Sequence, residues 1–345
     1  MEIKTIEWIN GKVRWLNTLL LPYEESYVES SSYERVAEAI ERMEIRGAPA
    51  IGVAAAFGVA LAASSFEGSD ISSFRSFLMK VIERFERTRP TAVNLFWALD
   101  RLRSLIVSYV GEVDRLKELL IEEAMKIYKE DIEVNKLIGY YGSQLIDDGD
   151  VILTHCNAGA LATAGYGTAL GVIRSAWYSG KRIKVVATET RPVLQGARLT
   201  VWELIKEGIP VVLITDSMVG YLMSKGMISK VIVGADRILS TGHVINKIGT
   251  YTIAVVASRH RIPFYVAAPT STIDLRKKVD EVVIEERDPN EVRYVLGKLL
   301  ITVPNVDVLN PSFDITPPEL ITAIITEKGV ITKPIEDNLP KFMSR

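Results

Sequence analysis

Hydrophobic positions in roughly the first 130 residues recur with the three- and four-residue spacing of amphipathic helices. This pattern predicts helices over residues 32–43, 49–63, 71–87, 92–107 and 114–146, after a short β-hairpin around residues 13–16. The last helix is too long for one ordinary helix without a bend. Its polar middle, rich in Lys and Glu, is typical of a bridge between two domains.

After Gly149 the pattern changes to short β-branched runs that alternate with helical segments. The predicted strands cover residues 151–154, 183–188, 211–215, 231–234, 264–267 and 282–284, and predicted helices include residues 161–179 and 196–207. Such alternation is typical of a parallel sheet with helices on both faces. The sequence therefore predicts an α/β protein with a mostly helical N-terminal domain, residues 1–130, followed by a Rossmann-like parallel-sheet domain, residues 131–345.

One uncharged stretch, residues 47–63, resembles a membrane span in composition. It is rich in Ala and Gly, has Pro49 near its start, and is shorter than the roughly 20 strongly apolar residues that a span needs. Small residues suit close packing of a helix against its neighbours. We therefore expect a buried helix here and no interaction with a membrane.

The composition favours a small metabolite as the partner. The chain has 345 residues, of which 48% are hydrophobic, and its 41 Lys and Arg nearly balance its 43 Asp and Glu. Such a balance gives no indication of nucleic-acid binding. The start of the chain lacks an apolar signal core, and a single cysteine fits a reducing compartment, so we expect a cytoplasmic protein. The presence of only two glutamines is compatible with a thermophilic source.

In a parallel sheet, ligands bind beyond the carboxyl ends of the strands. Residues 154–160, Thr-His-Cys-Asn-Ala-Gly-Ala, follow the first predicted strand and lead into a predicted helix. Small residues there let the backbone approach a ligand, and free N–H groups at a helix start would favour an anion or the Cys156 thiolate. The alternative is a buried structural cysteine. The position of Cys156 at a strand end favours a functional role.

Three further runs in the second domain carry candidate polar groups. Residues 189–198 combine a glutamate, two arginines and Gln195, which suits either a polyhydroxylated ligand or a solvated loop with an internal ion pair. Asp236 follows the fourth predicted strand, where it serves either as an acid or base or as a helix N-cap. Asn246 and Lys247 offer an amide and an ammonium near a helix start.

In the first domain, two arginines precede predicted helices that begin with proline. Arg46 opens the run 46–52, which includes Gly47 and Ala48, and Arg89 opens the run 89–95. An arginine at such a helix start is suited to bind a phosphate. Either arginine would equally serve to cap the C-terminus of a neighbouring helix.

Two other motifs do not indicate a site. Residues 165–167, Gly-Tyr-Gly, lie in a predicted helix, and with Gly171 they have the wrong spacing for a dinucleotide fingerprint. The three histidines are widely separated and accompany no cysteine cluster, so we expect no zinc site.

The candidate runs together resemble the methylthioribose-1-phosphate isomerase family, which belongs to a wider group that includes the alpha, beta and delta subunits of translation initiation factor 2B. The resemblance spans nearly the whole chain. It rests on residues 46–52, 89–95, 155–167, 190–204, 234–238, 246–251 and 310–318. The run 310–318 is shared across the wider group. No departure falls at a position to which we assign a catalytic role, and a minor divergence lies at residues 239–243.

The resemblance implies conversion of 5-methylthioribose 1-phosphate to 5-methylthioribulose 1-phosphate in methionine salvage. It implies that Asp236 donates a proton and that Cys156 is the second catalytic group, with neither a metal nor a nicotinamide cofactor. It also implies a homodimer built through the second domain. The residues implied to hold the phosphate and hydroxyls are Arg46, Gly47, Ala48, Arg89, Gln195, Asn246 and Lys247.

Two alternatives remain open at the level of the sequence. One is a ribose-1,5-bisphosphate isomerase of the same group, and the other is a regulatory subunit without turnover. The apolar residues that follow Arg46 and Arg89 favour the methylthio substrate, because a second phosphate would need further cations. Since the two arginines and the catalytic pair lie in different predicted domains, we expect the site to lie between them and to close on binding.

Overall fold

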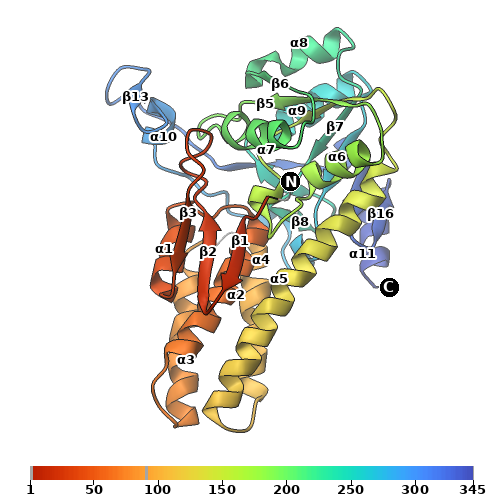
Figure 1. Ribbon diagram of the computed structural model, residues 1–345. Coiled ribbons are helices and arrows are strands. Elements are labelled where there is room, and N and C mark those ends of the chain that lie inside the picture. Colours follow the sequence, from red (N-terminus) through yellow and green to blue (C-terminus); the bar gives the residue numbers. More distant parts are fainter. Residues whose placement is uncertain (1–2, 90–91, 345) are drawn as a thin grey trace. The chain divides into compact units, whose positions relative to one another are not determined.

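A computed structural model describes residues 3–89 and 92–344 (Figure 1). The chain divides into two compact units. The helical unit comprises the chain up to Asn135 together with Ala160–Gly167, and the sheet unit comprises Lys136–Gly159 and the chain from Thr168 onward. The expected domain boundary at residue 130 remains a prediction, because compactness does not test whether either part folds alone.

The helical unit begins with a three-stranded antiparallel sheet in the order β1-β2-β3. Asn10 and Gly11 form the turn between the first two strands, both with positive φ (49° and 74°), as a two-residue hairpin loop requires. The predicted hairpin and helices are confirmed, and the third strand is an addition. Their bounds are β1 (Ile6–Ile9), β2 (Lys12–Leu16), β3 (Tyr27–Ser30), α1 (Tyr33–Glu41), α2 (Ala48–Ser65), α3 (Ile71–Glu86), α4 (Val93–Ser108) and α5 (Val113–Ser143).

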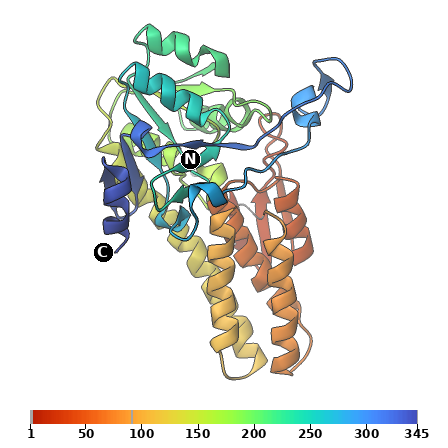
Figure 2. The same cartoon turned by 180° about the vertical axis from the view of Figure 1, so that it is seen from behind.

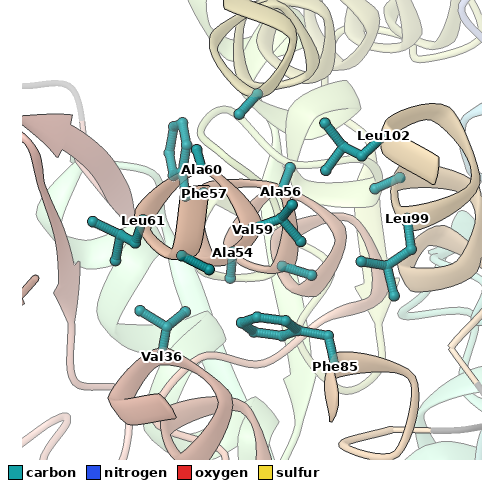
Figure 3. Packing of buried hydrophobic residues seen from close by; sticks show 14 of the residues in the cluster. Val36, Ala54, Ala56, Phe57, Val59, Ala60, Leu61, Phe85, Leu99 and Leu102 are labelled. Atoms are coloured by element: carbon teal, nitrogen blue, oxygen red, sulfur yellow. The ribbon is translucent and has the colours of Figure 1, made fainter. Parts of the chain in front are cut away.

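Helix α2 forms the centre of the helical unit, with fifteen of its eighteen residues buried. Its Phe57 and Val59 lie among side chains from the surrounding helices (Figure 3). A Cβ built on Gly58 would be 2.1 Å from Cζ of Phe85, so α3 approaches α2 closely at this glycine. Helix α2 is long and apolar enough to cross a membrane, but 83% of it is buried inside the protein, as predicted for this stretch.

The sheet unit contains a seven-stranded sheet in the order β16-β15-β10-β7-β4-β5-β6. All neighbouring strands are parallel except β16, which is antiparallel to β15. Counted along the chain, the six parallel strands lie in the order 3-2-1-4-5-6, which is the order of the Rossmann fold. The strands are β4 (Val151–Thr154), β5 (Lys184–Thr188), β6 (Val211–Ile214), β7 (Lys230–Val233), β10 (Phe264–Ala267), β15 (Ala323–Thr326) and β16 (Gly329–Thr332).

Five helices of the sheet unit have six to ten residues each. They are α6 (Ala169–Tyr178), α7 (Val201–Lys206), α8 (Val219–Ser224), α9 (Thr250–Arg259) and α11 (Ile335–Met343). A π-helical turn, Gly196–Thr200, precedes α7. A second sheet, in the order β11-β8-β9-β14, was not expected. Its strands are β8 (Arg237–Leu239), β9 (Val244–Lys247), β11 (Ile273–Asp274) and β14 (Phe313–Thr316).

Two predicted elements differ from the structure. Residues 282–284 are not a strand; Val283 is 83% exposed in an extended stretch that also carries α10 (Asn290–Arg293), β12 (Tyr294–Val295) and β13 (Leu299–Leu300) (Figure 2). The helix predicted from residue 161 begins only at Ala169, because Tyr166 and Gly167 have positive φ. Most of residues 114–146 form one continuous helix, α5, and the bend expected there stays a prediction.

Candidate active site

Cys156 and Asp236 follow the two central strands of the Rossmann order. Cys156 comes two residues after β4 and Asp236 three residues after β7, and these strands pair directly through Leu153 and Val231. The strand order reverses between β4 and β7, which makes this position the switch point where such sheets bind ligands. Because the strands are parallel, both residues emerge at the same edge of the sheet.

Two buried threonine hydroxyls hold the backbone of Cys156. Its N–H donates to Oγ1 of Thr190 (2.8 Å), and its carbonyl accepts from Oγ1 of Thr200 (2.6 Å). Cys156 itself has φ +61°, a left-handed conformation that costs a non-glycine residue about 1 kcal/mol. The surrounding hydrogen bonds therefore stabilise a conformation that the residue would otherwise avoid.

The expected helix start at Cys156 is absent, because α6 begins thirteen residues later at Ala169. The small residues after Cys156 instead pack inside the protein. A Cβ built on Gly159 would be 2.2 Å from Oε2 of Glu203, and Glu203 is a fully buried partner of Arg174. The amide of Asn157 donates to Oε1 of Glu203 (2.9 Å). This cluster anchors the loop that carries Cys156.

The loop after β5 is held by Asp216, which the sequence did not single out. Its carboxylate accepts from the backbone N–H groups of Thr190 (2.8 Å) and Arg191 (2.7 Å). The guanidinium of Arg191 donates to the carbonyls of Pro192 and Val292, so it binds the protein's own backbone. Arg191 is therefore held by the protein itself, whereas Gln195 of the same loop remains a candidate ligand group.

Gln195 is 8% exposed, and its Oε1 has no hydrogen-bond partner among the described residues. A buried amide oxygen without a partner costs about 1–3 kcal/mol, so it is a strong acceptor for a ligand hydroxyl. The next residue, Gly196, lies directly against the carbonyl of Thr188, where a Cβ would be at 1.8 Å. Gln195 is thereby placed at the carboxyl end of β5.

Asp236 is half-buried and does not cap a helix, since strand β8 begins at the next residue. Its backbone N–H donates to the carbonyl of Ile245 (3.0 Å), which joins its loop to β9. Asn246 and Lys247 end that strand. The amide of Asn246 donates to Thr250 (3.0 Å), and Nζ of Lys247 lies 4.8 Å from the ring centroid of Phe313.

The N-terminus of α9, beside these residues, is occupied by a protein carboxylate. Asp314 on β14 accepts from the N–H groups of Gly249 (2.7 Å) and Tyr251 (3.0 Å). Burial raises the pKa of Asp314 to about 6, although these hydrogen bonds and Lys247 act in the opposite direction. The sequence pattern does not predict this role, because the run around Asp314 indicates only membership of the wider group.

The remaining candidates, Arg46, Gly47, Ala48 and Arg89, belong to the helical unit. Gly47 precedes α2 with φ +92°, and a Cβ on it would be 2.5 Å from Cα of Ala162. A Cβ on Gly52 would be 2.7 Å from the carbonyl oxygen of Asn94, so the N-terminal parts of α2 and α4 lie together. Pro90 and Thr91, which belong to the run after Arg89, lie outside the described residues.

Within residues 3–89 and 92–344, no group of three or more His, Cys, Asp or Glu side chains is arranged to hold a metal ion. His155 is bound on both ring nitrogens by protein groups, at 2.7 Å to Thr188 and 2.8 Å to Ile248. The candidate groups that follow the strands at the switch point are a thiol, a carboxyl, an amide and an ammonium, a set that suits acid–base chemistry on a polar ligand.

Comparisons with known proteins agree with the resemblance. The methylthioribose-1-phosphate isomerase of Thermotoga maritima is 55% identical over 344 residues, 99% of each chain. The structure of 5-methylthioribose 1-phosphate isomerase from Pyrococcus horikoshii matches with a TM-score of 0.92 and 45% identity, covering 99% of this chain and 96% of that one. A structure described as subunit delta of translation initiation factor eIF-2B from A. fulgidus matches with a TM-score of 0.88 and 49% identity, over 99% and 100%. Residues 44–333 match the model of the Initiation factor 2 subunit family, so the chain belongs to that family.

Proposed function

We propose that this protein is an aldose–ketose isomerase that converts 5-methylthioribose 1-phosphate to 5-methylthioribulose 1-phosphate, a step of methionine salvage. The observation that carries the proposal is the emergence of Cys156 and Asp236 from adjacent strands at the switch point. The isomerases that are 55% identical over 99% of their length support it.

The substrate explains why a carboxyl and a thiol are needed together. Phosphate on O1 prevents the sugar from opening to a free aldehyde, so ring opening needs an acid at the ring oxygen. Asp236 donates that proton as the bond from C1 to the ring oxygen breaks, and the former ring oxygen becomes the C4 hydroxyl. The hydrogen on C2 then moves to C1, and the C2 hydroxyl loses its proton to the Asp236 carboxylate, which restores the acid and leaves the ketone.

Cys156, on the loop that faces the loop of Asp236, acts at C1 and C2 of the substrate. In one route its thiolate takes the C2 hydrogen as a proton and returns it to C1. In the other route the hydrogen moves directly as a hydride, and Cys156 stabilises the cationic transition state. Both routes consume and release the same atoms, and both require the thiol to be held in place. The hydrogen bonds of the Cys156 backbone, to Thr190 and from Thr200, support this requirement.

The phosphate group binds the start of α2 in this proposal. Backbone N–H groups at Gly47 and Ala48 and the side chains of Arg46 and Arg89 supply donors and positive charge. The packing of the N-terminal parts of α2 and α4, through Gly52, supports this assignment. Gln195, Asn246 and Lys247 bind the hydroxyl groups, and the buried partnerless Oε1 of Gln195 supports that role.

The oligomeric state, cellular location and source of the protein are also proposals. We infer a homodimer formed through the sheet unit, a cytoplasmic location and a thermophilic source. The single cysteine and the scarcity of glutamine support the last two.

A turnover assay on the purified protein tests the proposal. We expect faster turnover per substrate concentration with 5-methylthioribose 1-phosphate than with ribose 1,5-bisphosphate, because apolar residues follow both arginines. Preference for the bisphosphate would favour the related isomerase activity. Absence of turnover with either sugar would favour a regulatory subunit, a possibility supported by the 49% identity to a protein described as an initiation factor subunit.

A further inference from the structure

A continuous set of hydrogen bonds connects the backbone of Cys156 to the segment that ends β9. The N–H of Cys156 lies 2.8 Å from Oγ1 of Thr190, which lies 3.2 Å from Oγ1 of Thr188. The Thr188 hydroxyl lies 2.7 Å from Nδ1 of His155, whose Nε2 lies 2.8 Å from the carbonyl oxygen of Ile248. All three side chains are at most 2% exposed.

The two ends of this chain determine the direction of every hydrogen bond in it. A carbonyl oxygen only accepts, so Nε2 of His155 carries a proton, and in the neutral imidazole Nδ1 is then an acceptor. Thr188 must then donate to Nδ1. The Cys156 N–H donates to Oγ1 of Thr190. The Thr190 hydroxyl in turn donates to Thr188, either to its Oγ1 (3.2 Å) or to its carbonyl oxygen (3.4 Å). Each group thus has one consistent role.

The protonation of His155 agrees with this direction. Burial lowers the pKa of His155, with smaller opposing contributions from the Ile248 carbonyl and Asp216, so the neutral imidazole is favoured. The facing charged groups are Asp216, which holds the N–H of Thr190, and Lys247, one residue before Ile248. A second proton on His155 would leave Thr188 without its acceptor.

We propose that Thr188, Thr190 and His155 are positioning residues that hold Cys156 in register with Asn246 and Lys247. This inference rests on the proposed function, in which Cys156 acts on the substrate and the other two bind it. Thr190 fixes the left-handed backbone of Cys156. His155 joins the same loop to Ile248, and a Cβ on the adjacent Gly249 would lie 3.2 Å from the imidazole, so the two segments are in direct contact.

The test compares Thr190→Val with Thr190→Ser. Valine keeps the shape and removes the acceptor for the Cys156 N–H, whereas serine keeps the hydroxyl. Thr326→Val is the matched control, because Thr326 is equally buried and its hydroxyl bonds a carbonyl (3.0 Å) in the turn between β15 and β16. Thr188→Val removes the next link and provides a second variant that leaves the Cys156 N–H bond in place.

We expect Thr190→Val to lower kcat at least tenfold while KM stays within twofold, because the thiol is misplaced and the binding groups remain. Alkylation of Cys156 by iodoacetamide should become at least threefold faster, because the loop that buries it opens more often. Thr190→Ser should restore both values, and Thr188→Val should change both in the same direction. The control should lower the melting temperature about as much as Thr190→Val without altering kcat or alkylation.

Unchanged kcat and alkylation in Thr190→Val would overturn the inference. It would also be overturned if Thr190→Ser failed to restore them, since shape and not the hydroxyl would then matter. Failure of the proposed function gives a different result, in which the wild type turns over neither sugar while Thr190→Val still accelerates alkylation of Cys156.

Discussion

Gly234 packs directly against Ala158: a Cβ built on Gly234 would lie only 2.7 Å from the Cβ of Ala158. Gly234 stands two residues before Asp236, and Ala158 stands two residues after Cys156. This contact joins the two loops that carry the proposed catalytic pair. The absence of a side chain at position 234 therefore allows the loops to approach as closely as they do.

The first prediction follows from this contact. Gly234→Ala should lower kcat at least tenfold, because the added methyl group must push the two loops apart. We expect a loss of about 1–3 kcal/mol in the free energy of unfolding, the usual cost of overpacking. The control is Gly220→Ala, since a Cβ on Gly220 meets nothing within 4 Å. Equal kinetics in the two variants would show that the contact has no functional role.

A second matched pair tests the start of α2. Gly47 and Gly180 share φ +92°, but only Gly47 faces a close neighbour, with Cα of Ala162 at 2.5 Å from its added Cβ. Both alanine variants should suffer the cost of positive φ, about 1 kcal/mol. Gly47→Ala should lose at least about 1 kcal/mol more in urea unfolding. Similar losses of unfolding free energy in the two variants would mean that the backbone at Ala162 shifts to accommodate the added methyl group at little cost.

Phosphate binding by Arg89 gives a third prediction. Arg89→Ala should raise KM about 10- to 100-fold, as expected for losing a charge-assisted hydrogen bond worth about 1.5–3 kcal/mol. The fold should persist, and far-UV circular dichroism measures that. Arg115→Ala is the control, because Arg115 is exposed on α5 and pairs only with Glu118 and Glu122 among the described residues. An unchanged KM in Arg89→Ala would remove this residue from the substrate site.

The raised pKa of Asp314 makes the fourth prediction one of pH dependence. Burial raises this pKa from 3.8 to about 6, so the folded protein binds the proton more tightly than the unfolded chain does. The contribution of Asp314 to stability is therefore fully present below about pH 4 and is lost as pH rises to about 6. Relative to Asp314→Asn, the wild type should lose stability in urea unfolding between these pH values. A constant difference between the two proteins would contradict the shift.

The spacing of hydrophobic residues predicts the helices and strands whose burial follows a regular period. Strand β4 and helix α2 lie where periodicity placed them, and the catalytic candidates follow β4 and β7 as the Rossmann rule requires. The apolar character of residues 161–168 predicts the start of helix α6, yet α6 begins at Ala169, and Ala160–Gly167 joins the compact unit formed by the first part of the chain. There Ala164 donates its N–H to Asp131 (2.7 Å). Such a tertiary contact leaves no periodic signal.

The positioning groups of the site were missed for a related reason. Thr190 is thirty-four residues from Cys156, and His155 is ninety-three residues from Ile248. Threonine and histidine occur in many buried settings, so their residue types alone do not indicate a role. Asp314 was recognised only as part of a shared run, because its partners at the start of α9 lie more than sixty residues earlier.

The proposed catalytic roles of Cys156 and Asp236 are tested most directly by turnover of 5-methylthioribose 1-phosphate. Cys156→Ala and Asp236→Asn each remove one proposed catalytic group with little change in volume. We expect each variant to lower kcat at least about a hundredfold, the low end of the loss for a positioned acid–base group. Melting temperatures close to that of the wild type would show that the variants remain folded. Turnover near the wild-type rate in a folded variant would contradict the catalytic role of the substituted residue.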